Sequence, residues 1–181
     1  MSGFGLRLAK SQGMEGFTGS TAEFAIAAAN TTAIFSGDPV ILASGVLTVA
    51  GVTSAAILGV FRGCHYTDAE GSKQYRPYWN GAAGSTDIQG IVAMPPHGMF
   101  WVKGEAGVDF AAATSVGALH PFVANAGSVQ YGDSRHTLGA PGAGALMVHR
   151  LVDIPGNAWG TDEPILEVSM NLQAGTYASA A

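Results

Sequence analysis

Residues 37–79 read GDPVILASGVLTVAGVTSAAILGVFRGCHYTDAEGSKQYRPYW, and the class of fold can be read from this stretch. Apolar runs of strand length alternate in it with short turns that contain glycine or aspartate. In the turn TDAEG at residues 67–71, the aspartate can bond nearby backbone and the glycine can adopt positive φ. The stretch therefore predicts a β meander of neighbouring antiparallel strands. The runs are residues 37–42, 46–50, 55–63 and 73–79.

Strand-like segments continue to the C-terminal part of the chain. Residues 166–173 show the most regular alternation, with apolar side chains on one face and Glu167 and Ser169 on the other, which predicts one buried and one exposed face. Residues 119–131 predict a hairpin with a turn at an Asn-Ala-Gly sequence. Residues 111–117 predict either a single helical turn or a crossing built of small residues. Further expected strands are residues 88–94, 99–105 and 145–154.

The N-terminal segment differs from the rest of the chain. Residues 1–22 are rich in glycine, serine and threonine, and their isolated apolar residues cannot bury enough surface alone to offset the entropy of ordering. We expect an extended arm that lies on its own domain or on a neighbouring subunit, or else a frayed terminus. Residues 23–181 are expected to form a single β-rich domain. The candidate interface residues are Phe4, Leu6, Leu8, Met14 and Phe17 in the arm and Trp159 in the loop at residues 155–164.

The composition indicates a subunit of an assembly. The chain has 181 residues, of which 48% are hydrophobic and only 12% are charged, whereas about 25% charged is usual for soluble domains. A charge-poor surface fits a protein that packs among other subunits better than it fits a free monomer. The alternative is a β protein that is simply rich in small residues.

The charge and the single cysteine exclude several classes of protein. With a net charge of −5 and only 8 lysines and arginines, the chain lacks the basic surface that direct nucleic-acid binding requires. No apolar run reaches the length of a membrane span, and the start lacks a signal-peptide pattern, so synthesis inside a cell is expected. Cys64 has no cysteine partner and is expected to be a small buried hydrophobic residue.

No motif indicates catalysis, a metal or a cofactor. Cys64 and His65 are adjacent, so on a strand they point to opposite faces and cannot easily act as nucleophile and base. Asp68 and Glu70 lack the remainder of a calcium loop, and the glycine clusters lack the lysine of a phosphate loop. We therefore expect no enzyme. The histidines, whose spacing fits no zinc motif, are His65, His97, His120, His136 and His149.

The order of these motifs resembles small structural proteins of tailed bacteriophages that serve as capsid decoration, or cement, subunits. The matching features are GDPV at residues 37–40, ILGVFRG at residues 57–63, YTDAEG at residues 66–71 and an aromatic strand that ends at Trp79. The resemblance spans residues 35–170 and rests on strand and turn patterns. It departs from shorter family members in the extra loops at residues 80–87 and 155–164.

The resemblance implies a compact β-barrel or β-tulip-like domain, usually a homotrimer, that sits near three-fold positions and clamps neighbouring subunits of the major capsid protein. It implies a location on the capsid surface of the virion, after synthesis in the host cytoplasm, and a structural role without enzymatic activity. Independent features of the sequence also suit a subunit that clamps its neighbours. They are the low charge, the N-terminal arm with isolated apolar residues, the available edge strands and the aromatic loop residues.

Two other classes fit parts of the pattern. Another virion component, such as a head-tail connector, tail or fibre-base protein, shares the β-rich, charge-poor character. A carbohydrate-binding or hydrolytic β domain is the third class, in which exposed aromatic side chains form a stacking platform. That reading requires the tryptophans to lie outside the core. Its candidate residues are Tyr75, Tyr78, Trp79 and Trp101.

Overall fold

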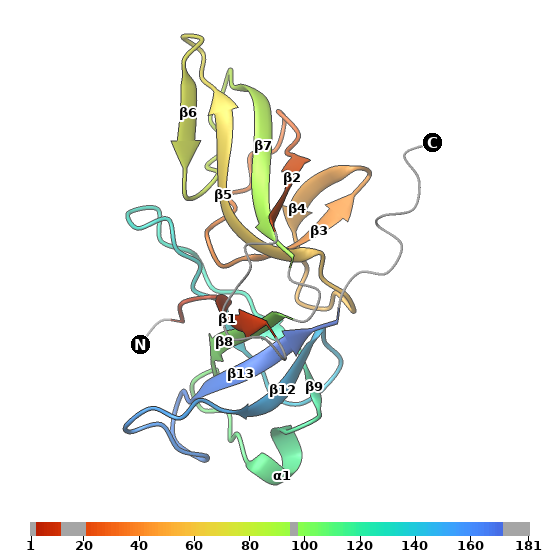
Figure 1. The fold of residues 1–181 in the computed structure, drawn as a ribbon, viewed down its shortest axis with the longest axis vertical. Helices are drawn as coiled ribbons and strands as arrows, with labels where there is room; N and C mark the ends of the chain where they lie inside the picture. Colours follow the sequence, from red (N-terminus) through yellow and green to blue (C-terminus); the bar gives the residue numbers. More distant parts are fainter. Residues whose placement is uncertain (1–2, 12–20, 95–97, 172–181) are drawn as a thin grey trace.

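The computed structural model describes residues 3–11, 21–94 and 98–171 of the chain. This part is almost entirely antiparallel β structure, which confirms the all-β class predicted from the alternating runs. Figure 1 shows two lobes stacked along the long axis of the molecule. The first half of the chain builds most of the upper lobe, and the N-terminal and C-terminal strands meet in the lower lobe.

The upper lobe is a six-stranded sheet that contains two of the predicted neighbouring pairs, β3 with β4 and β5 with β6. The order of a simple meander is wrong, because β5 pairs with β3 and not with β4. Its first hairpin closes at Ser44 and Gly45, both of which have positive φ, as two-residue hairpin loops require. Its second hairpin closes where Asp68 accepts a 2.7 Å hydrogen bond from the backbone N–H of Ser72. The strands are β2 (Thr21–Ala25), β3 (Pro39–Ala43), β4 (Val46–Val49), β5 (Gly59–Thr67), β6 (Lys73–Arg76) and β7 (Thr86–Ala93).

The lower lobe is a five-stranded sheet in which the N-terminal segment supplies an edge. Residues 7–11 pair with the strand at residues 98–103, so this part of the predicted arm lies on its own domain. A two-stranded ladder and one short helix, α1 (Ala112–Ser115), complete the lobe. The strands are β1 (Arg7–Ser11), β8 (Gly98–Lys103), β9 (Leu119–His120), β10 (Phe122–Val123), β11 (Thr137–Leu138), β12 (Leu146–Leu151) and β13 (Ile165–Met170).

The described residues form two apolar cores, one within the upper lobe and one in the lower lobe that also includes Val60 of β5. In the upper core, the fully buried ring of Phe61 packs with Trp79 and with Cys64, which confirms the buried position expected for the cysteine. In the lower core, Phe100 and Val168 come from the inward faces of β8 and β13, where alternation predicted them. Burial of side chains of this size supplies the main stabilisation of each lobe.

Two further expectations are wrong for the described residues. The edge strands are β2, β4 and β6 in the upper lobe and β1 and β9 in the lower lobe, and these strands do not pair with each other, so no closed barrel forms. The predicted hairpin at residues 119–131 is also absent, because β10 pairs with β11 instead. The sequence motif at its turn is used in a longer loop, in which Gly127 faces the ring of Phe35.

A polar junction joins the lobes. Asp38 precedes β3, and its carboxylate lies 3.3 Å from Nε2 of His136, which precedes β11. The other ring nitrogen of His136, Nδ1, accepts a 3.0 Å hydrogen bond from the backbone N–H of Asn125, so the ring fits its neutral form. Burial lowers the pKa of His136 and raises the pKa of Asp38, because both charged forms lose water at the junction.

Candidate functional site

A row of four side chains crosses the outer face of the lower sheet. The strand register places Arg7 of β1 opposite Trp101 of β8, Trp101 opposite Glu167 of β13, and Glu167 opposite Arg150 of β12. We call these four residues the Trp101 row. Directly opposed side chains on one sheet face lie close enough to interact, so the row forms one continuous surface.

The row is held in place by its own hydrogen bonds. The indole N–H of Trp101 donates to Oε2 of Glu167 at 3.3 Å, and the Arg150 guanidinium contacts both oxygens of the same carboxylate at 2.9 and 3.1 Å. This contact raises the pKa of Arg150. Glu167 is buried beneath its partners, although the alternation placed it on an exposed face, while Trp101 remains 38% exposed. The tryptophan is thus both accessible and fixed in orientation.

The two ends of the row differ in their partners. Arg150 is paired with Glu167, whereas Arg7 has no carboxylate partner within the described residues and lies over the ring of Phe4 at 4.8 Å. Close to this end, Lys103 forms a 2.8 Å ion pair with Glu163. The surface therefore offers an indole and a guanidinium whose charge is still available to a partner.

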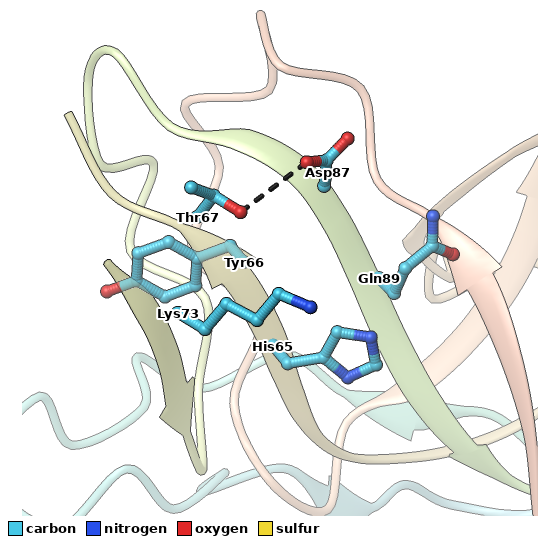
Figure 2. A pocket seen from close by; sticks show the side chains of 6 residues that line it. All are labelled: His65, Tyr66, Thr67, Lys73, Asp87 and Gln89. Carbon is cyan, nitrogen blue, oxygen red and sulfur yellow. Dashed lines mark hydrogen bonds between the residues drawn. The ribbon is translucent and has the colours of Figure 1, made fainter. Parts of the chain in front are cut away.

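A second candidate lies on the outer face of the upper lobe, where β5, β6 and β7 meet. Figure 2 shows this depression of about 230 Å³, whose lining includes His65 and Thr67 of β5, Lys73 of β6, and Asp87 and Gln89 of β7. The ammonium end of Lys73 and the ring of His65 face the same open space, with Gln89 beyond them and Asp87 at the far end. The depression collects hydrogen-bond donors and acceptors without a reactive arrangement.

An exposed tyrosine lies beside His65, one of the residues that line this depression. Tyr75 pairs with His65 across β5 and β6 and is 63% exposed. Its ring reaches over β5 at Gly63, where a side-chain carbon would come within 2.7 Å of the tyrosine hydroxyl. The glycine therefore allows the ring to lie across the sheet, and any larger residue would displace it.

The predicted interface residues that the structure describes lie in different environments. Leu6 is 2% exposed and belongs to the lower core. Leu8 and Trp159 are half-buried against that core, and Phe4 is half-buried beneath Arg7. Met14 and Phe17 lie outside the described residues.

The proposed aromatic platform does not form. Trp79 is fully buried and donates its indole N–H to the backbone carbonyl of Asn30 at 3.0 Å, and Tyr78 stacks on Phe35. Trp101 lies on the other lobe, so of the four candidates Tyr75 alone is strongly exposed on the upper sheet face. A stacking site built from both tryptophans is therefore excluded.

Catalytic chemistry gains no support from the other candidate residues. Burial raises the pKa of the Cys64 thiol to about 11, which makes it a poor nucleophile. His65 lies on the opposite face of β5, 3.7 Å from the carboxylate of exposed Glu23. Across residues 3–11, 21–94 and 98–171, no three histidine, cysteine or acidic side chains gather in a way that fits a metal ion.

Sequence reasoning missed the Trp101 row. Alternation along residues 99–105 places Trp101 on the polar face with Lys103. An aromatic residue on a polar face indicates a candidate binding surface. The other three members come from different strands, and only the pairing register brings them together.

No family model, no curated protein and no solved structure matches this chain. In the described portion, no helix is long and apolar enough to cross a membrane.

Proposed function

We propose that this protein is a structural component of a virion that decorates and stabilises an icosahedral tailed-phage capsid, as a homotrimer that clamps neighbouring major capsid subunits. The observation that carries the proposal is the Trp101 row, in which Glu167 fixes an exposed indole and an arginine stands at each end. The resemblance of residues 35–170 to phage decoration proteins supplies the identity of the partner.

The chemistry of the Trp101 row suits protein binding. Tryptophan and arginine are the residues most enriched among those that dominate interface energies. Because Glu167 already holds the indole of Trp101 and the guanidinium of Arg150, little side-chain entropy remains to be lost on docking. Such a surface contributes binding energy without any reaction.

Available strand edges support the same function. β1, which contributes Arg7 to the Trp101 row, forms one edge of the lower sheet, and β2, β4 and β6 are edge strands of the upper sheet. An edge strand can accept a strand of a neighbouring subunit through backbone hydrogen bonds. A clamp that uses an edge and the adjoining face grips a partner on two sides, and many such contacts together resist the pressure of packaged DNA.

The direct test uses capsids of the encoding phage that have been assembled without this protein. Wild-type protein should bind them to saturation and raise the temperature at which they rupture. Trp101→Ala should weaken binding by at least about 30-fold, as removal of a central interface tryptophan does. Tyr131→Ala is the matched control and should bind like wild type, because it removes a 66% exposed aromatic side chain that lies in a loop outside the Trp101 row.

Two results decide against parts of the proposal. Failure of the wild-type protein to bind capsids overturns the decoration function, and unchanged binding of Trp101→Ala overturns the role of the row. Copies confined to one vertex would instead identify a head-tail connector. Light scattering during size-exclusion chromatography tests the trimer, which should have about three times the 18.4 kDa mass of one chain.

A further inference from the structure

We propose that the depression between β5 and β7, together with Tyr75, is a saccharide-binding site. It lies on the upper sheet, whereas the Trp101 row lies on the lower sheet. The two surfaces can therefore be engaged separately, and the inference stands apart from the capsid-binding role.

The polar side chains of the depression present both donors and acceptors to one open space (Figure 2). Lys73 has no ion-pair partner within the described residues, so its ammonium group is free to donate. Thr67 donates to one carboxylate oxygen of Asp87 at 3.4 Å, and no other described side chain occupies the second oxygen. Gln89 adds an amide with both functions. Sugar hydroxyls, which donate and accept at once, match this mixture.

The backbone conformation at Asp87 fixes the position of this hydrogen-bond acceptor. Asp87 has a φ of 50° at the point where the register between β5 and β7 shifts, a conformation that aspartate and asparagine tolerate better than most residues. Ile88 remains buried below it, so Asp87 and Gln89 share the outer face. A left-handed residue within a strand carries strain, and such positions cluster at binding sites.

Tyr75 supplies the apolar part of the site. Its side chain stands beside His65 in the strand register, and its ring extends across Gly63 with most of its surface open to solvent. The C–H face of a pyranose ring packs on an exposed aromatic face, while its hydroxyl groups reach polar side chains at the rim. The tyrosine and the depression provide these two functions side by side.

The charges favour a sugar over a nucleotide. Glu23 lies 3.7 Å from His65, and Asp87 stands at the other end of the depression, so carboxylates flank the site on both sides. A phosphate backbone would be repelled by these groups and by the net charge of −5. Hydroxyl groups meet no such penalty, because carboxylates accept hydrogen bonds from them.

The test is a chemical-shift titration of the full ¹⁵N-labelled chain with three trisaccharides: N-acetylchitotriose, maltotriose and trigalacturonate. We expect at least one sugar to bind with a Kd of about 1 mM, as an open surface site allows. Shifts should concentrate at residues 63–67, 73–75 and 87–89. A neutral sugar should be preferred, with its hydroxyl groups at Asp87 and Gln89, because the carboxylates of Glu23 and Asp87 disfavour an anion. Preference for trigalacturonate would contradict this charge argument.

Variants identify the site. Tyr75→Ala removes the ring, and Asp87→Asn removes the charge while retaining a residue that tolerates the left-handed backbone. Each should weaken binding by about 10-fold. Tyr131→Ala is the control of similar exposure and should bind like wild type. The proposal is overturned if no trisaccharide shifts any resonance, if the shifts lie elsewhere, or if Tyr75→Ala and Asp87→Asn leave binding unchanged in well-dispersed spectra.

Discussion

The outer faces of the two lobes use polar side chains in opposite ways. On the lower sheet, Trp101 and Arg150 are bound to the same buried carboxylate of Glu167. On the upper sheet, the His65–Glu23 contact is 3.7 Å long and Lys73 has no ion-pair partner within the described residues. A surface whose polar side chains are already hydrogen-bonded to each other suits a macromolecule of complementary shape. Polar side chains without such bonds suit a ligand that forms hydrogen bonds with them.

Buried side chains join the two lobes. The lower core includes Val60 of β5, and the buried polar side chains of Asp38, Ser134 and His136 also lie where the lobes meet. Backbone hydrogen bonds also cross the junction, from Ser36 to Gly132 and from Ser134 to Ser36. The lobes are therefore expected to unfold as one cooperative unit.

The largest expected effect comes from equivalent truncations in the two cores. Phe61→Ala in the upper lobe and Phe100→Ala in the lower lobe each remove a fully buried ring, and each should lower the free energy of unfolding by about 3–5 kcal/mol. Urea denaturation measures the loss, and calorimetry should show a single transition for both variants. Val129→Ala, at a position 61% exposed, is the control and should change stability little. Two separate transitions in either variant would contradict the coupling of the lobes.

A smaller loss of stability is expected when Gly63, on the outer face of the upper sheet, is replaced by alanine. Gly63→Ala places a carbon 2.8 Å from the carbonyl oxygen of Arg76 and 2.7 Å from the hydroxyl of Tyr75, and should cost about 1–3 kcal/mol. Gly142→Ala is the matched control, because its nearest neighbour would lie 3.9 Å away. Thermal unfolding of both variants checks the difference. Equal melting temperatures would show that the ring of Tyr75 moves aside without cost.

The junction should make stability depend on pH. Since burial lowers the pKa of His136, the unfolded state binds more protons than the folded state as the pH falls below 6.5, and the free energy of unfolding decreases by at most about 1.4 kcal/mol per pH unit. The raised pKa of Asp38 acts in the opposite sense, because its contribution is lost as the pH rises above 3.8. Urea titrations across this range measure both.

His136→Gln isolates the histidine contribution to this dependence. The variant should have a flatter decrease in stability between pH 6.5 and lower values, because the titrating ring is gone while an amide can still reach Asp38. Tyr131→Ala retains the junction and should retain the slope. A slope in His136→Gln equal to that of wild type would assign the pH dependence to other groups.

The smallest change to the protein is chemical labelling of the Cys64 thiol in the upper core. Cys64 is fully buried and its pKa is raised to about 11, so a thiol reagent at pH 8 should react with the folded protein far more slowly than with protein in urea. Absorbance of the released thiolate follows the reaction. Rates that match in the two conditions would mean that the upper lobe opens readily.

Local patterns in the sequence were sufficient for the strands and their inward faces. The strands within residues 37–79 and the inward positions of Val168 and Phe100 follow from turn residues and from alternation with a period of two. The order of these strands did not follow, because β5 pairs with β3 and not with its neighbour in sequence, β4. The buried position of Glu167 was not predicted, because alternation assigns a face but cannot tell whether a partner such as Arg150 will cover the side chain.

The sequence alone therefore established an all-β, charge-poor chain with a buried cysteine, since these properties depend on composition and on neighbours along the chain. Tertiary structure was required for everything that depends on strand register. It joined Arg7 to Trp101 and Glu167, and it brought Asp38 to His136. Residues so distant in sequence meet only when whole sheets pair, and the free energy that selects one pairing is spread over both cores rather than encoded in any short segment.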